Sequence, residues 1–541
     1  MNTILKEIQP RLDFLRVLPV ASRPNDLLPS RFEDKVGGQL AKEFGAYLEK
    51  MISDGTYTPS SASFVPVPKP GFTTRPAALL TLSDRIVFEA LIDSIKPSIE
   101  KKLLSSDHVM WPRATYVDKR WGEFEKAPLL TEEDYIVNAD VTAFYDSIDH
   151  SILEDKIVKL TGENKVANAL KLFLDRIMGS NKGLPQGILG SDTLATLYLQ
   201  SVDAAMLRTG FSYWRHGDDI RMSVENMSLA RESIATVEAE LRKIGLVLNS
   251  SKCLIQKADH YDKHLKETNK VYETIKRKIY EEKVKYLSED DEALIATMDK
   301  AELDEQFKWD LFYHHSITIE EVIQQISEHL QPDELDIAID LFRSTLEGLP
   351  DGDNPLPKDQ FHVQLTRSIL RLAAGKSEEA IDSAAMLIAK FPEKTELIST
   401  YLLSLVSLCS NDVALQVEDI INSDLFLTVW QKAWIYRVML DCAEELQNET
   451  IQRISDKCLN PKSHWLEKVE GFKLLSKLNV LQFEVLRDHW DLVPEAYKPD
   501  LICSIVFLSR DCDKSKRFLE GIKQDPIERV VASHCIDKFL I

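Results

Sequence analysis

Trp214–Met222, with the sequence WRHGDDIRM, is the stretch that decides the fold. It lies inside Phe211–Val224, where two runs of strand-forming residues meet at Gly217, Asp218 and Asp219. Such a pattern predicts a β-hairpin with a tight turn. Two adjacent acids on a turn repel each other, and a divalent cation would offset that repulsion. The turn is therefore a candidate metal site, although an ordinary Asp-rich turn can have the same letters.

A second acidic stretch lies upstream at Asp140–His150, with the sequence DVTAFYDSIDH. Asp140 follows the apolar residues Tyr135–Val137, so a buried strand would present its carboxylate rigidly at one end. Phosphoryl transfer uses carboxylates to hold Mg²⁺, because negative charge develops on the attacking and leaving oxygens. The alternative interpretation is a surface loop that happens to be rich in acids.

A third motif, GLPQGILGS at Gly183–Ser191, predicts a defined loop in front of a helix that runs to about Arg208. After the hairpin, apolar residues recur at helical spacing until Gly245 ends the helix. The order expected across this region is strand, helix, hairpin, helix, strand.

These motifs resemble, in order and spacing, the palm motifs of reverse transcriptases. Asp140 matches the first acid of motif A, Gly183–Ser191 the LPQG motif B, and Asp218-Asp219 the paired acids of motif C. The stretch IGLVLNSSKC at 244–253 is similar to motif D, and VPVPKPGFTTRPAALLTLSDRIV at 65–87 to the fingers segment. The resemblance covers about 190 residues and implies a right-hand polymerase with fingers and palm.

The resemblance also implies the site. Asp140, Asp218 and Asp219 would hold two Mg²⁺ ions, with Mn²⁺ as the alternative cofactor. Lys69 and Arg75 match bases that bind the incoming triphosphate.

Three further residues have implied roles in the same site. Gln186 and Gly187 would pack against the nucleotide and the template base, and Lys252 would protonate the departing pyrophosphate. Surface lysines and arginines are the alternative interpretation for Lys69, Arg75 and Lys252.

Tyr145 bears on the product, because reverse transcriptases place a bulky ring there that excludes a 2′-hydroxyl. The GDD triplet is instead typical of RNA-synthesising polymerases, which are the enzyme alternative; Tyr145 and the LPQG motif favour deoxynucleotides. The family usually has a tyrosine two residues before the paired acids, where this chain has His216. A catalytically silent scaffold that binds nucleic acid is the non-enzyme alternative.

Composition fits a globular protein, with 44% hydrophobic and 28% charged residues. The net charge of −21 is uneven. Residues 1–260 carry 32 Lys and Arg against 35 Asp and Glu, whereas residues 261–541 carry 34 against 52. The seven scattered cysteines form no CxxC pair, which favours a reducing cytoplasm. We found no signal peptide and no apolar run near the ~18 residues of a membrane span.

After a linker at Asp351–Pro357, the second half has the sequence pattern of successive amphipathic helices. We therefore predict an N-terminal region with fingers (1–130), a palm (131–256), a charged helical or thumb-like connection (257–350) and an α-helical repeat-like domain (351–541). A helical half attached to a compact palm resembles the abortive-infection and defence-associated reverse transcriptases of bacteria.

That second resemblance implies antiphage defence, assembly into oligomers or with a partner protein, and either a non-coding RNA template or none. Some relatives prime synthesis from a protein side chain, for which Tyr47 and Tyr57 are the candidates upstream of the fingers. The sequence gives no reason to choose between them.

Overall fold

A computed structural model describes residues 1–25, 27–31, 33–34, 41–103, 109–110, 120–266, 318–350, 356–423, 425–510, 512–522, 528–529 and 532–533. Most of the charged connection and most of the linker predicted before residue 357 lie outside these described residues. The four predicted domain boundaries stay predictions.

The palm is a five-stranded sheet in the order β3-β5-β6-β4-β7. Its strands are β3 (Val109–Met110), β4 (Tyr135–Ala139), β5 (Ser212–His216), β6 (Asp219–Val224) and β7 (Leu254–Lys257). Apart from the parallel β3–β5 pair, all neighbours run antiparallel. The β5–β6 hairpin and the order of strand, helix, hairpin, helix and strand confirm the prediction from the sequence.

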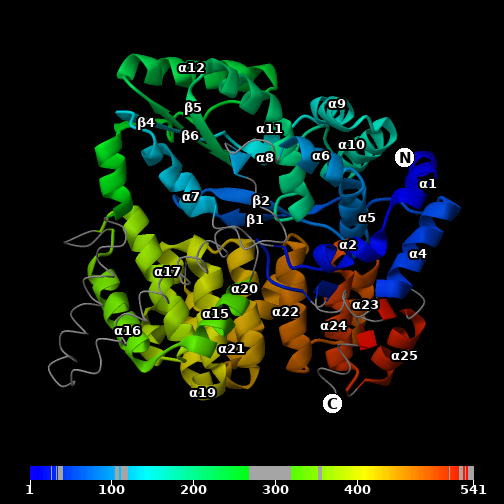
Figure 1. The fold of residues 1–541 in the computed structure, drawn as a ribbon. Coiled ribbons are helices and arrows are strands. Elements are labelled where there is room, and N and C mark those ends of the chain that lie inside the picture. The colour runs from blue at the N-terminus through cyan, green and yellow to red at the C-terminus, as the bar shows by residue number, and fades with distance from the viewer. Residues whose placement is uncertain are drawn as a thin grey trace.

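Two long helices, α11 (Leu189–Thr209) and α12 (Met227–Lys243), pack against this sheet and against each other. Each follows directly from a motif, α11 from the LPQG loop and α12 from the hairpin. Asn226 caps α12 by accepting hydrogen bonds from the backbone N–H groups of Ser228 and Leu229. Figure 1 shows α12 on the outer side of the sheet.

A second sheet is the two-stranded hairpin of β1 (Ser63–Pro68) and β2 (Thr74–Leu79). Other helices of the N-terminal half surround it and the palm: α1 (Asn2–Ile8), α2 (Phe14–Ala21), α4 (Ala41–Asp54), α5 (Leu82–Asp93), α6 (Lys96–Leu103), α7 (Arg120–Lys126), α8 (Phe144–Ser147), α9 (His150–Thr161) and α10 (Asn164–Met178). Short 3-10 turns are η1 (Gln9–Arg11) and η3 (Ala127–Leu130).

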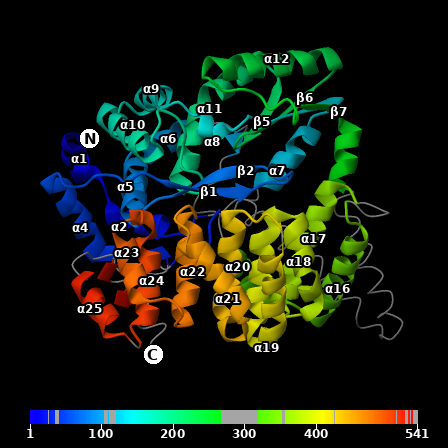
Figure 2. The same cartoon turned by 180° about the vertical axis from the view of Figure 1, so that it is seen from behind.

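The described C-terminal half is helical. Its α-helices are α15 (Ile319–His329), α16 (Pro332–Glu347), α17 (Lys358–Ala374), α18 (Ala384–Lys390), α19 (Thr395–Asn422), α20 (Val429–Asp441), α21 (Asn448–Leu459), α22 (Trp465–Lys477), α23 (Phe483–Trp490), α24 (Lys498–Leu508) and α25 (Asp513–Ile522). Its 3-10 turns are η5 (Glu378–Ser383), η6 (Pro392–Lys394), η7 (Ala443–Glu445) and η8 (Glu495–Tyr497). Figures 1 and 2 show these helices side by side as a layer beneath the β1–β2 hairpin, with the palm on the other side of it.

One segment, Pro392–Asn422, is long and apolar enough to cross a membrane by length and composition, which the sequence analysis overlooked. Half of its most apolar window is buried inside the protein. The helix is also interrupted at Cys409, where the backbone leaves helical geometry. Buried residues of this segment, such as Leu402 and Leu405, belong to the core of the helical half, as in a core helix of a folded domain.

Candidate active site

Strand pairing brings the acidic motifs together. β4 pairs with β6 in a register that places Ala139 opposite Ile220, so the next pair outward is Asp140 and Asp219. Residues opposite each other on antiparallel strands project from the same face of a sheet. Asp218 lies in the turn between β5 and β6, immediately before Asp219. The three predicted acids therefore lie together at one end of the central strands.

A buried ion pair stabilises the turn that contains Asp218. Gly217 has a φ of +59°, a conformation that glycine adopts without steric cost. The Arg215 guanidinium donates to the Gly217 carbonyl at 2.8 Å and to both carboxylate oxygens of Asp203 at 2.6 and 2.7 Å. Asp203 belongs to α11 and also accepts from the Tyr213 hydroxyl at 2.8 Å. This network fixes the turn to the helix that follows the LPQG loop.

Burial and mutual repulsion disfavour the ionised form of two of these carboxyls. Burial, followed by the charge of Asp140, raises the pKa of Asp218 above its usual value. Burial and the charge of Asp218 raise the pKa of Asp219 to about 6. Asp140 itself is only 5% exposed. The site therefore concentrates negative charge where the protein alone stabilises it poorly, which is the condition that a bound cation relieves.

Asp140 already has two partners from the motif D segment. Lys252 Nζ donates to its Oδ1 at 2.9 Å and Asn249 Nδ2 donates to its Oδ2 at 3.1 Å. Burial lowers the pKa of Lys252, but the hydrogen bond and charge of Asp140, with Asp219 and Asp218, leave it raised overall. The lysine ammonium thus supplies positive charge beside the acids, as a cation would.

In the part of the chain that the structure describes, no group of three or more His, Cys, Asp or Glu side chains is arranged closely enough to hold a metal ion. The chemistry of Asp140, Asp218 and Asp219 nevertheless fits Mg²⁺, because all three offer carboxylate oxygens, the ligands this ion prefers.

The two predicted triphosphate-binding bases lie at the turn end of the β1–β2 hairpin. Lys69 N donates to Thr73 O at 2.7 Å across the hairpin turn, and Arg75 pairs with Val67 on β1. Burial lowers the pKa of Arg75, whereas the charges of Asp218 and Tyr145 act to raise it. Burial and Arg75 likewise lower the pKa of Lys69. These interactions place both bases within electrostatic range of the palm acids.

Tyr145 and Gln186 also belong to this region. The Tyr145 hydroxyl donates to Asp192 Oδ1 at 2.5 Å, which joins motif A to the first turn of α11. Gln186 Nε2 donates to Asp146 Oδ1 at 3.0 Å, which joins the LPQG loop to the same stretch as Tyr145. The motif A and motif B segments are therefore bonded to each other by side chains.

Two features of the structure require glycine at position 187. Its φ is +86°, and a Cβ there would lie 2.1 Å from the side-chain oxygen of Asn25. Asn25 Nδ2 donates to Gln186 O at 3.2 Å and to Ala78 O on β2 at 3.0 Å. The LPQG loop is thus bonded to the fingers hairpin through Asn25.

The sequence analysis missed four residues that complete the site: Asn25, Asp192, Asp203 and Asn249. Asp192 had a local signal, because it is the acid in the first turn of α11. Burial raises the pKa of Asp192 to about 6, although the Tyr145 hydroxyl acts to lower it. Asn25 had no such signal, because its partners are the backbone carbonyls of Ala78 and Gln186, 53 and 161 residues away. Asp203 pairs with Tyr213 and Arg215 only 10 and 12 residues on, but no periodicity links a helix to the strand that follows it.

The two tyrosines suggested as priming residues lie elsewhere. Tyr57 is 3% exposed and its hydroxyl donates to Asp84 Oδ1 at 2.6 Å in the core, so this hydroxyl does not face the palm acids. Tyr47 belongs to α4, which packs against α1 and α2 at the opposite end of the molecule from β5 and β6 (Figures 1 and 2). His216 ends β5, opposite Asp219, with its ring tilted against Phe124 at 5.8 Å between centroids.

The raised pKa of Asp219 predicts how acid and metal affect stability. The folded protein keeps this carboxyl protonated up to about pH 6, whereas the carboxyl ordinarily titrates near 3.8. Folding is therefore favoured at low pH, and this contribution is lost as the pH rises from about 4 to 6. In metal-free protein we expect Asp219→Asn to raise the melting temperature at pH 7.5 but not at pH 4.5. Mg²⁺ should raise the wild-type melting temperature at pH 7.5 and do so less at pH 5.

Differential scanning fluorimetry on both proteins measures these shifts. Glu225→Gln is the matched control, because Glu225 is an exposed carboxylate just beyond the other end of β6. Equal melting temperatures of wild type and Asp219→Asn at every pH would contradict the prediction.

Comparison with protein families finds a match that lies mostly in the N-terminal half of the chain. Residues 67–289 match the family model described as reverse transcriptase (RNA-dependent DNA polymerase). No curated protein matches the chain. The matched range contains all nine residues that the sequence analysis placed in the site. It indicates an RNA-directed DNA polymerase-like nucleotidyltransferase with fingers and palm, followed by a helical C-terminal part.

Proposed function

We propose that the protein adds deoxynucleotides to a primer by two-metal phosphoryl transfer at Asp140, Asp218 and Asp219. The observation that carries this proposal is the β4–β6 register, which sets Asp140 beside Asp219 at the end of the hairpin. A scaffold that only binds nucleic acid has no need to keep three partly buried acids together against their repulsion. Polymerase chemistry needs that arrangement, because the metal sites are made of carboxylates.

Each residue of the site has a role in this reaction. When bound, Mg²⁺ would be held by the three carboxylates and would stabilise the charge that develops on the reacting phosphate. Lys69 and Arg75 bind the triphosphate of the incoming nucleotide from the hairpin above. Lys252 donates a proton to the departing pyrophosphate once it has left Asp140. Gln186 and Gly187 form the surface against which the nucleotide packs.

Replacing one carboxylate tests the reaction directly. We expect Asp218→Asn to lower the rate of incorporation of labelled deoxynucleotides by about 100-fold or more, because a lost metal ligand removes several kcal/mol of transition-state stabilisation. Glu225→Gln makes the same chemical change away from the site and should leave the rate unchanged. The rates are measured with purified full-length protein, Mg²⁺ and separate deoxynucleotides.

Full incorporation by Asp218→Asn would exclude the proposed site. Full biological activity of an Asp218→Ala, Asp219→Ala double variant would instead favour the scaffold alternative. Exclusive use of ribonucleotides by the wild type would favour the RNA-synthesising alternative, which the GDD triplet supports.

Tyr145 provides a test of sugar selection. The ring, not the hydroxyl, excludes the 2′-hydroxyl in this proposal, and the hydroxyl is occupied by its bond to Asp192. We therefore expect Tyr145→Ala to reduce the preference for deoxynucleotides over ribonucleotides by about 10-fold or more, as when a steric contact is removed from a pocket. Tyr145→Phe keeps the ring and should keep the preference. The preference is measured as the ratio of kcat/KM for deoxynucleotides to kcat/KM for ribonucleotides. The same ratio in wild type, Tyr145→Ala and Tyr145→Phe would contradict the role of Tyr145 in sugar selection.

We further propose that the enzyme works in bacterial antiphage defence, in the cytoplasm, as one of the abortive-infection group. The order of the domains supports this proposal, because a compact palm is followed by a helical half whose sequence resembles helical repeats. In this proposal the helical half also contributes contacts for self-assembly or for a partner defence protein. The acidity of residues 261–541 suits protein contacts better than phosphate.

The nucleic acid that co-purifies with the protein identifies primer and template. Sequencing it before and after protease treatment separates two expected outcomes. DNA released only by protease indicates protein priming, and a single structured RNA indicates a dedicated template. Co-purification of random cellular RNA alone, with no loss of phage resistance in Asp218→Asn cells, would contradict the defence proposal.

A further inference from the structure

The β1–β2 hairpin shares its hydrophobic core with the C-terminal half and not with the palm. Val65, Val67, Ala77 and Leu79 are buried in the same cluster as the apolar residues of the described C-terminal helices. The palm sheet and its helices form a separate cluster. The strands that present Lys69 and Arg75 are thus seated on the helical layer by their apolar faces.

Hydrogen bonds to backbone carbonyls fix the orientation of the two packed halves. Trp430 Nε1 of α20 donates to Leu27 O at 2.6 Å. His464, which caps α22, lies with Nε2 3.1 Å from Phe64 O on β1, while its Nδ1 accepts from Leu466 N. Because one ring nitrogen faces a carbonyl and the other accepts an N–H, the hydrogen bonds define one neutral tautomer. Both contacts join helix starts of the C-terminal half to the N-terminal half.

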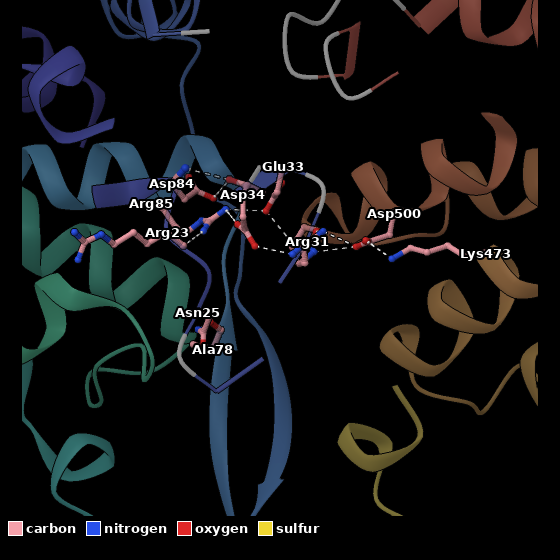
Figure 3. Close-up of polar contacts among 12 residues, drawn as sticks. Arg23, Asn25, Arg31, Glu33, Asp34, Ala78, Asp84, Arg85, Lys473 and Asp500 are labelled. Atoms are coloured by element: carbon pink, nitrogen blue, oxygen red, sulfur yellow. Dashed lines mark hydrogen bonds and ion pairs between the residues drawn. The ribbon is translucent and has the colours of Figure 1, made fainter. Parts of the chain in front are cut away.

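A buried ion network makes the third connection (Figure 3). Arg31 donates from Nε and a terminal nitrogen to Asp500 Oδ2 of α24, at 2.9 and 2.6 Å, and also to the Ala496 carbonyl. Lys473 of α22 lies 2.7 Å from the other carboxylate oxygen of Asp500. One carboxylate on the helical half therefore holds one base from each half.

The same network continues to the helix that follows the hairpin. Arg31 donates to Glu33 at 2.9 Å, and Arg85 of α5 lies 3.0 Å from Glu33 and 2.7 Å from Asp34. All of these side chains are buried, Asp500 with 1% and Arg31 with 6% exposure. Because buried charges are stable only when paired, the network is satisfied in one arrangement of the two halves and disrupted in others.

Residues 25–34 thus connect three parts of the enzyme. Asn25 bonds both β2 and the LPQG loop, Leu27 accepts from Trp430, and Arg31 binds Asp500. We propose that the helical half is the platform that positions the fingers hairpin over the palm acids, with Arg31 and Asp500 as positioning residues for nucleotide binding. This inference rests on the proposed polymerase function, because Lys69 and Arg75 bind the triphosphate in it.

Conservative variants of full-length protein test the platform. Asp500→Asn keeps the shape but leaves Arg31 and Lys473 without the charge between them, and Arg31→Lys keeps the charge but cannot make both contacts to Asp500. We expect each to raise the KM for deoxynucleotides by about 5-fold or more, the range of a coupling between distant sites, while kcat changes less than about 2-fold. Glu379→Gln, which breaks the exposed Arg343–Glu379 ion pair, is the control and should change neither.

Hydrogen exchange gives a readout that does not depend on activity. Asp500→Asn and Arg31→Lys should accelerate exchange in residues 63–79, far along the chain from position 500, whereas Glu379→Gln should not. Trp430→Phe keeps an aromatic ring in the core but removes the hydrogen bond to Leu27, so it tests the same contact surface if a charge variant fails to fold. It should raise the KM and the hairpin exchange in the same direction.

Two results would contradict the proposal that the helical half positions the hairpin. The first is an unchanged KM in variants whose hairpin exchanges faster, because the network would then be structural only. The second is unchanged exchange in residues 63–79. If the wild type incorporates no nucleotide, the proposed polymerase function fails, while the exchange experiment still decides whether the helical half holds the hairpin.

Discussion

The structure depends on keeping three acidic side chains together at the ends of paired strands. Asp140, Asp218 and Asp219 repel one another, and burial adds to the cost of their charge. A sheet can impose this arrangement because its register fixes which residues stand opposite, and the register in turn is fixed by the buried face of each strand. Val137 and Ala139 on β4 lie opposite Met222 and Ile220 on β6, and all four are buried in the same core. A shift of one residue would turn them to the other face of the sheet.

Neighbouring groups compensate for the concentrated charge without removing it. Lys252 and Asn249 bind Asp140, and Arg215 binds the Gly217 carbonyl while its own charge is neutralised by Asp203. Arg215 therefore supports the turn through a neutral pair and does not cancel the charge of Asp218. Asp218 is therefore left able to attract a cation. Asp219 has a weak ion pair of its own, because the Arg221 guanidinium lies 3.8 Å from its carboxylate.

The sequence predicted the parts of this site that depend on local pattern. The hairpin, the helix after the LPQG loop and the strand before Asp140 each follow from spacing and turn residues within about 20 positions. Other features depend on pairs that are distant in the chain. Tyr145 and Asp192 are 47 residues apart, and no periodicity links them. Tyr57 was a candidate because it lies upstream of the fingers, but it is buried, and Asp84 from α5, 27 residues away, accepts from its hydroxyl.

The packing of the β1–β2 hairpin against the helical half could not be predicted from the sequence either, because the contacting residues are far apart in the chain. Val65 and Val67 occupy alternate positions of β1 and are buried on one face, but alternation shows only that a face is buried and not against which partner. The partner is set by Arg31 and Asp500, which are 469 residues apart. A polymerase must hold its triphosphate-binding bases at a fixed position relative to its metals, and this chain has the hairpin on one core and the acids on another. Asn25, Leu27 and Arg31 bond the two cores together, in addition to the direct backbone bond from Ala78 N to Gln186 O at 3.3 Å. The precision of the site therefore depends partly on contacts that lie outside it.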